Sequence, residues 1–194
     1  MSIENLPTRD RILAACLELL ENGSNARMSD IAKRAGVSRQ AVYLHFGSRA
    51  ELLIETTFFV DKLHNVDTRL APSREAKTGE IRLAAYIDAW AAYLPIVWPL
   101  LNALRAMGPG DAEAQAAVDQ RMQDMKEGCD AAIMALKRDG MLSSTYTAQQ
   151  ATDLLWAVLQ PEVWHRLVDT CGWSQTQYAD LIAKTAGHLF VQSD

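Results

Sequence analysis

The 194-residue sequence has few of the features that mark secreted, membrane-spanning or metal-binding proteins. Its first ten residues have neither a basic opening nor an apolar run, so we expect no secretory signal. The longest apolar stretches, such as 154–159, are too short to cross a bilayer. The 3 cysteines are widely spaced and include no CxxC pair, which favours small core side chains over zinc or redox chemistry. We therefore expect a cytoplasmic protein that contacts no membrane and uses no metal or cofactor.

Signatures of catalysis are also missing. The four histidines, His45, His64, His165 and His188, are scattered along the chain. There is no nucleophile elbow or phosphate-binding loop, and no acidic pair stands at metal-ligand spacing beside a histidine. The sequence therefore predicts a protein that is not an enzyme.

Charge is distributed unevenly between the two ends of the chain. The formal net charge of −5 argues against a protein that coats nucleic acid indiscriminately. Residues 1–50, however, hold seven Lys and Arg against five Asp and Glu, whereas residues 51–194 hold twelve against nineteen. A local excess of positive charge is what contact with phosphates requires, so the N-terminal segment is the candidate nucleic-acid contact.

All strong hydrophobic periodicity in the sequence is helical, which predicts an all-α fold of about nine helices. We expect helices at about 8–21, 29–35, 39–46, 48–70, 80–94, 96–107, 111–139, 148–159 and 175–190. Segment 71–79 is rich in turn-forming residues and is the expected loop, and Pro95 and Pro99 are expected to interrupt the helix that begins near residue 80. Ser48, Thr147 and Ser174 each stand three residues before Glu or Gln, as in a capping box.

Segment 29–43 has the residues that a helix-turn-helix needs. Ala32 is small where two helices must cross, and Ile31 and Val42 are apolar at inward positions. Gly36 can adopt the positive φ of the tight turn, and Ser38 can cap the second helix. These features predict that the helix from Ser38 to Phe46 reads DNA.

The outward side of that second helix carries groups suited to bases and phosphates. Arg39 can donate two hydrogen bonds to guanine, Gln40 can pair with adenine, and Ala41 can touch a thymine methyl group. The side chains of Ser38, Tyr43 and His45 are better placed for phosphates, which position a protein without reading sequence.

Segment Arg9–Leu53 resembles the DNA-binding domain of the TetR family of transcriptional regulators. The residues that carry the resemblance are the turn AGVS at 35–38, the motif YxHF at 43–46 and the basic residue Arg49. The resemblance implies phosphate contacts by Tyr43, His45 and Arg49, and by the start of the preceding helix, where Arg27 and Ser29 stand. Family members usually have Lys in place of Arg49, and Thr or Ser in place of Arg27.

The same resemblance implies a helix-turn-helix domain at 1–50 and a helical ligand-binding and dimerisation domain at 51–194. Segments 160–164 and 171–174 are similar to a pattern near the C-termini of family members, where the last two helices pair with those of a partner. The residues expected at such a homodimer interface are Leu181, Ile182, Ala186, Leu189 and Phe190. The alternative is that this helix face packs only within its own subunit.

Aromatic residues and methionines cluster beyond the N-terminal third, and all 5 tryptophans follow residue 89. In the TetR family the helices at these positions surround a small-molecule pocket, and Trp, Tyr and Met suit an apolar or aromatic ligand. The expected ligand-binding residues are Trp90, Tyr93, Met125 and Trp156. For each of them, ordinary core packing is the competing interpretation.

Together these expectations describe a ligand-responsive repressor that binds a palindromic double-stranded DNA operator as a homodimer and is released by a small apolar or aromatic effector. The alternative is a DNA-bound adaptor of the same fold that is regulated by a protein partner.

Overall fold

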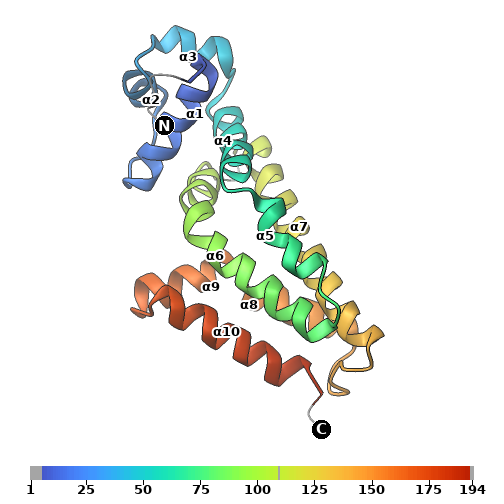
Figure 1. Ribbon diagram of the computed structural model, residues 1–194. Coiled ribbons are helices and arrows are strands. Elements are labelled where there is room, and N and C mark those ends of the chain that lie inside the picture. Colours follow the sequence, from blue (N-terminus) through green and yellow to red (C-terminus); the bar gives the residue numbers. More distant parts are fainter. Residues whose placement is uncertain (1–5, 109, 193–194) are drawn as a thin grey trace. The chain divides into compact units, whose positions relative to one another are not determined.

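The computed structural model describes residues 6–108 and 110–192 and is helical almost throughout (Figure 1). Within these ranges the only β-type pairing is an isolated bridge between Leu142 and Val191. The predicted all-α class is therefore confirmed.

The described residues form ten α-helices and one π-helix. They are α1 (Thr8–Glu21), α2 (Met28–Ala35), α3 (Arg39–His45), α4 (Arg49–Leu63), α5 (Val66–Arg74), α6 (Gly79–Arg105), α7 (Ala112–Arg138), α8 (Ala148–Val158), α9 (Pro161–His165), η2 (Arg166–Thr170) and α10 (Gln175–Phe190).

The chain divides into two compact units. The first contains the described residues up to His64 together with 96–120, and the second contains 65–95 and the described residues from Arg121 onward. Helices α6 and α7 therefore contribute residues to both units. The functional division at residue 50 expected from the sequence stays a prediction.

Side-chain caps define where several helices begin. The Thr147 and Ser174 hydroxyls each accept from the backbone three residues ahead, and Gln150 and Gln177 accept in return, which completes two capping boxes. The Ser48 hydroxyl likewise accepts from the Glu51 amide, at 2.9 Å. A complete capping box would also have the Glu51 carboxylate accept from the Ser48 amide. Here it accepts instead from the amide of Gly47, the residue before the N-cap, at 2.7 Å.

The predicted interruption of the helix after residue 94 is wrong, because α6 runs continuously through Pro95 and Pro99. A proline inside a helix leaves the carbonyl four residues earlier without its usual amide donor. For Pro95 that carbonyl belongs to Ala91, and the side-chain amide of Gln175 donates to it at 2.7 Å. A side chain from the start of α10 thus replaces the hydrogen bond that Pro95 cannot make.

The predicted long helix to residue 70 and the predicted loop at 71–79 are also wrong in part. Helix α4 ends at Leu63, and Asn65 then adopts a left-handed conformation with φ of 48°. Asparagine tolerates this region better than most residues, so the chain can turn here and begin α5, which includes Pro72. The hydroxyl of Ser73 in α5 donates to the carbonyl of Arg82 in α6, at 3.0 Å.

Two of the three cysteines are core residues, as predicted. Cys16 and Cys129 are fully buried, and burial raises the pKa of each thiol to about 12, so both remain protonated and unreactive. The expectation is wrong for Cys171, which is exposed at the end of the π-helix, directly before Gly172 with its φ of 75°.

Helix α6 is long and apolar enough to cross a membrane, judged by length and composition alone. The expectation that every apolar stretch is too short to cross a bilayer is therefore wrong for this helix. Half of its most apolar window is buried inside the fold. The expectation of no membrane contact stays a prediction.

Gly79 stands where the start of α6 meets the backbone of α7. A Cβ atom there would lie 2.4 Å from the backbone nitrogen of Leu136. A Cβ on Gly187 in α10 would meet nothing within 4 Å.

We expect Gly79→Ala to lower the free energy of unfolding by about 1–3 kcal/mol through overpacking, and Gly187→Ala to raise it by about 0.5–1 kcal/mol through helix propensity. Urea denaturation of both variants tests this pair, and a Gly79→Ala protein as stable as the parent would contradict it.

Candidate nucleic-acid interface

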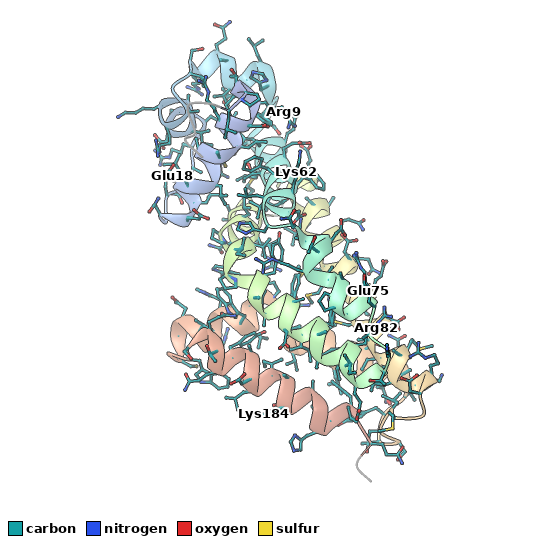
Figure 2. The ribbon with its side chains drawn as sticks, viewed as in Figure 1. Arg9, Glu18, Lys62, Glu75, Arg82 and Lys184 are labelled. Carbon is teal, nitrogen blue, oxygen red and sulfur yellow. The ribbon has the colours of Figure 1, made fainter. Side chains whose placement is uncertain are left out.

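Helices α1 to α4 form a small head around a shared apolar core. Helix α1 contacts α2 and α4, and α2 contacts α3. The side chains that are fully buried in this head include Ile12, Cys16, Ile31, Val42 and Phe46. Two ion pairs, Arg9 with Glu55 and Arg34 with Glu18, join its helices at the surface; Arg9 and Glu18 are labelled in Figure 2.

The turn between α2 and α3 has the predicted conformation. Gly36 ends α2 with φ of 66° and ψ of 35°, in the left-handed region that glycine adopts most readily. The Val37 amide donates to the Ala32 carbonyl at 3.0 Å. The Ser38 hydroxyl then accepts from the Ala41 amide at 3.0 Å, which starts α3. The described geometry is a helix-turn-helix.

Burial fixes which side of α3 faces the solvent. Val42 and Phe46 are fully buried, so the helix is held by these two side chains. The exposed side chains are those of Ser38, Arg39, Gln40, Tyr43, Leu44 and His45, with Ala41 half-buried. The structure therefore brings the predicted base-reading and phosphate-binding residues of α3 together on one outward face.

Leu44 is an exposed member of this face to which the sequence pattern assigned an outward position but no DNA contact. Its side chain is 80% exposed, the highest value among the large hydrophobic side chains described as exposed. The sequence carried a signal for it, because the inward positions Val42 and Phe46 leave Leu44 on the outward side. An apolar side chain on a DNA-reading face can contact a thymine methyl group.

Arg39 and Tyr43 contact each other on this surface, one helical turn apart. The Arg39 guanidinium lies 5.5 Å from the centre of the Tyr43 ring, and its Nη2 donates to the Tyr43 hydroxyl at 3.4 Å. The contact supports the long arginine side chain on an aromatic face, as is common for guanidinium groups.

The remaining predicted DNA contacts lie outside α3 and differ in their burial and in their hydrogen bonds. Arg27 is the N-cap residue of α2, is exposed and makes no side-chain cap, and Ser29 in the first turn is exposed. Arg49 is half-buried, and its guanidinium donates to the backbone carbonyls of Asn25 and Ala26 at 2.6 and 3.4 Å. In this structure Arg49 is bound to the α1–α2 loop.

The four predicted ligand-binding residues lie in the second unit. Trp90, Tyr93 and Met125 are buried, and the Trp90 and Tyr93 rings have centres 6.1 Å apart. The Trp90 indole donates to the Leu159 carbonyl at 2.9 Å. Trp156 is half-buried, and its indole donates to the Met122 carbonyl at 3.0 Å.

Tyr178 in α10 is a further buried polar residue of the second unit. Its hydroxyl has no hydrogen-bond partner among the described residues, and burial raises its pKa. One turn earlier, Gln175 binds the carbonyl of Ala91, the neighbour of Trp90. An unpaired buried hydroxyl is a group that a bound molecule can satisfy.

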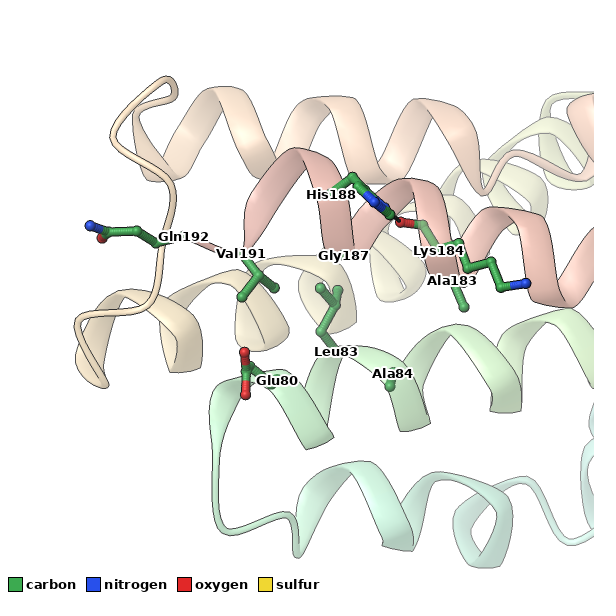
Figure 3. A pocket seen from close by; sticks show the side chains of 9 residues that line it. All are labelled: Glu80, Leu83, Ala84, Ala183, Lys184, Gly187, His188, Val191 and Gln192. Atoms are coloured by element: carbon green, nitrogen blue, oxygen red, sulfur yellow. Dashed lines mark hydrogen bonds between the residues drawn. The ribbon is translucent and has the colours of Figure 1, made fainter. Parts of the chain in front are cut away.

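A shallow groove of about 430 Å³ lies between the first turns of α6 and the last turns of α10 (Figure 3). Its lining residues are Glu80, Leu83, Ala84, Ala183, Lys184, Gly187, His188, Val191 and Gln192. Figure 3 shows the Leu83 and Val191 side chains pointing toward the space between the two helices. None of the four predicted ligand-binding residues lines this groove.

The predicted dimer residues of α10 face different environments. Ile182, Ala186 and Phe190 are buried within the subunit, where they continue a stripe that begins at Tyr178. Leu189 is half-buried, and Leu181 is 43% exposed. Within this set, Leu181 presents the largest open apolar surface.

Residues 12–56 match the family model described as bacterial regulatory proteins, tetR family. The HTH-type transcriptional regulator SrpR of Pseudomonas putida is 46% identical over 48 residues, which cover 24% of this chain. The match spans only 22% of the length of SrpR, so it relates a segment of each protein and not the whole chains.

Solved structures share the fold over nearly the whole chain. A transcriptional regulator from Saccharomonospora viridis in complex with choline superposes with a TM-score of 0.81 at 18% identity, covering 95% of this chain and 98% of that one. The regulator FadR from Bacillus subtilis in complex with stearoyl-CoA gives a TM-score of 0.70 at 16% identity, covering 90% and 95%. Residues 12–56 thus match the tetR family of bacterial regulatory proteins, and the chain as a whole shares the fold of these solved structures.

Proposed function

We propose that the protein is a transcriptional repressor that binds a palindromic DNA operator as a homodimer and is released by a small apolar or aromatic effector. The observation that carries the DNA-binding part is the outward face of α3. Arg39, Gln40 and Tyr43 stand exposed on a helix that Val42 and Phe46 anchor and Ser38 caps. A helix presented in this way fits the major groove.

Roles on this face follow from the chemistry of each group. Arg39 and Gln40 have side chains that form paired hydrogen bonds with guanine and adenine, so they are proposed to select bases, with Ala41 and Leu44 available for thymine methyl groups. The hydroxyl of Tyr43 is proposed to bind phosphate, and so are Ser38, His45, Arg27 and Ser29.

A homodimer supplies the second recognition helix that a palindrome requires. Helices α8 and α10 contact each other, and each exposes one leucine: Leu154 is 41% exposed and Leu181 is 43% exposed. We propose that these two side chains, with the half-buried Leu189, contribute to the dimer interface.

Effector binding is proposed for the second unit, which contains Trp90, Tyr93, Met125 and Trp156 and in which the Trp90 and Tyr93 rings lie 6.1 Å apart. The structural neighbours that hold choline and stearoyl-CoA support small-molecule binding within this fold. The indole N–H groups of Trp90 and Trp156 are already bound to backbone carbonyls, so an effector would meet ring faces and the Met125 thioether, which favours an apolar or aromatic molecule. The unpaired hydroxyl of Tyr178 is one polar group that it can satisfy.

Release is proposed to be a shift in population between two conformations of the dimer, only one of which fits the spacing of the operator half-sites. The effector must prefer the released conformation by about 1–3 kcal/mol or more to reduce operator occupancy substantially. Helix α4 is the proposed lever, because it follows α3 directly in the chain.

The second candidate function keeps the same DNA-binding head and replaces the effector by a protein partner. The burial of Trp90, Tyr93 and Met125 favours this alternative, because buried side chains of this kind also serve as ordinary core. The effector experiment below separates the two.

We expect Arg39→Ala to cost about 1–3 kcal/mol of discrimination at one base pair of the operator, since a bidentate base contact is lost. Tyr43→Phe is expected to weaken binding to all duplexes alike, since a phosphate contact carries no sequence information. The measurement is fluorescence anisotropy on a duplex from upstream of the protein's own gene and on its single-base variants, at fixed salt. Arg74→Ala, which removes an exposed cation paired with Asp67, is the control. Unchanged binding by both head variants would show that α3 is not the reading helix.

Leu181→Glu is expected to raise the dimer dissociation constant at least about 100-fold, because it places an unpaired charge in the proposed interface. Met134→Glu is the matched control, since Met134 is equally exposed, at 44%, but lies on α7. Sedimentation velocity over a concentration series measures both variants. A Leu181→Glu protein that dimerises like the parent would exclude Leu181 from the interface.

An effector is expected to raise the melting temperature of the protein and to release it from its duplex, with about 2.7 kcal/mol of stabilisation at a concentration 100 times Kd. The panel should include apolar aromatic compounds, choline and stearoyl-CoA. Trp156→Phe is expected to weaken the response, whereas Trp173→Phe, at another half-buried tryptophan, is expected to leave it intact. If no compound both stabilises and releases the protein, the adaptor alternative is favoured.

A further inference from the structure

We propose that Arg49 is a positioning residue that holds the α1–α2 loop, and through it the start of α2, in the conformation that meets DNA, and that it makes no phosphate contact of its own. This inference rests on the proposed DNA-binding function, because it assigns a role within the same head. It also departs from the role that the family resemblance implies for this position.

The guanidinium of Arg49 joins two consecutive carbonyl groups of the loop. Its Nη2 atom donates to the Asn25 carbonyl at 2.6 Å and its Nε atom donates to the Ala26 carbonyl at 3.4 Å. We call this pair of bonds the Arg49 clamp. A guanidinium suits it because its donors are spread over three nitrogen atoms in a rigid plane, whereas the donors of a lysine ammonium share one atom.

The loop that the clamp holds has an unfavourable backbone conformation. Ala26 has φ of 43°, a left-handed value that residues with a Cβ atom rarely adopt. Its side chain is fully buried, and its amide donates to the Ser24 hydroxyl at 3.2 Å. Such a conformation persists only when surrounding contacts hold it in place. The two hydrogen bonds of the Arg49 clamp are among those contacts.

The clamped residues lead directly into the start of α2. Arg27, the next residue, is the N-cap, and its carbonyl accepts from the amides of Asp30 and Ile31 at 2.9 and 3.0 Å. A change in the loop at Ala26 therefore moves Arg27 and the first turn of α2, which carries Ser29. Both residues are proposed phosphate contacts. Losing the clamp should weaken DNA binding without removing any contact between Arg49 and phosphate.

The first test uses the full-length protein without DNA. Hydrogen exchange is compared at the amides of Ala26, Asp30 and Ile31 in the parent, Arg49→Lys and Arg49→Ala. We expect about tenfold faster exchange in Arg49→Ala, and clearly faster exchange in Arg49→Lys, because local opening of the loop becomes easier. The control is Arg34→Lys, a charge-conserving change at the last turn of α2 that keeps the pairing with Glu18 and should exchange like the parent. Unchanged exchange in both Arg49 variants would overturn the proposal, and Arg49→Lys keeps the test valid if Arg49→Ala does not fold.

The second test measures the salt dependence of duplex binding. For a positioning role, Arg49→Lys should bind about tenfold more weakly at fixed salt, because the loop must be ordered on binding. The slope of log Kd against log salt should equal the parent's, because the bound complex still makes the Arg27 and Ser29 phosphate contacts. A phosphate contact would instead leave Arg49→Lys close to the parent and reduce the slope in Arg49→Ala by about 0.9, and that result would overturn the proposal. If the parent protein bound no duplex at all, the proposed function would fail, while the exchange experiment would still decide on the Arg49 clamp.

Discussion

The burial of Val42 and Phe46 is the constraint on which the DNA-binding head depends. These two side chains are fully buried, and because they stand four residues apart they fix the rotation of α3 about its own axis. Once that rotation is set, Arg39, Gln40, Tyr43 and Leu44 must face outward. The Ser38 cap and the left-handed turn at Gly36 then decide where the helix starts. The reading face is thus a consequence of core packing in the head.

Polar side chains stabilise the second unit where the backbone lacks partners. Gln175 donates to the Ala91 carbonyl that Pro95 leaves without an amide donor, and its own carbonyl oxygen accepts from the Trp164 indole at 2.8 Å. Trp90 and Trp156 likewise direct their N–H groups to backbone carbonyls. These bonds let large aromatic residues pack inside a helical body without unpaired donors, and they leave the Tyr178 hydroxyl as an exception.

Local signals made the head predictable. Gly36, Ser38 and the apolar positions of α2 and α3 act over a few residues, so the sequence alone predicted the helix-turn-helix and the outward face of α3. The course of α6 depended on a contact that is distant in sequence. At Pro95 the missing hydrogen bond is replaced by the one from Gln175, eighty residues away, to the Ala91 carbonyl. No local sequence pattern predicts that hydrogen bond. The same holds for Arg49, whose carbonyl partners lie more than twenty residues earlier in the chain. Ile182, Ala186 and Phe190 are buried within the subunit, and periodicity alone cannot distinguish such an internal face from a dimer face.

If α3, fixed by Val42 and Phe46, is the surface that meets DNA, a bound duplex must cover its outward side chains. The most direct measurement is hydroxyl-radical footprinting of the full-length protein, read by mass spectrometry with and without a tightly bound duplex. We expect DNA to protect Tyr43, Leu44 and His45 strongly, while exposed residues of α8 and α10 such as Leu154 and Leu181 react equally with and without DNA. Equal reactivity of Tyr43 and Leu44 in the free and DNA-bound protein would contradict it.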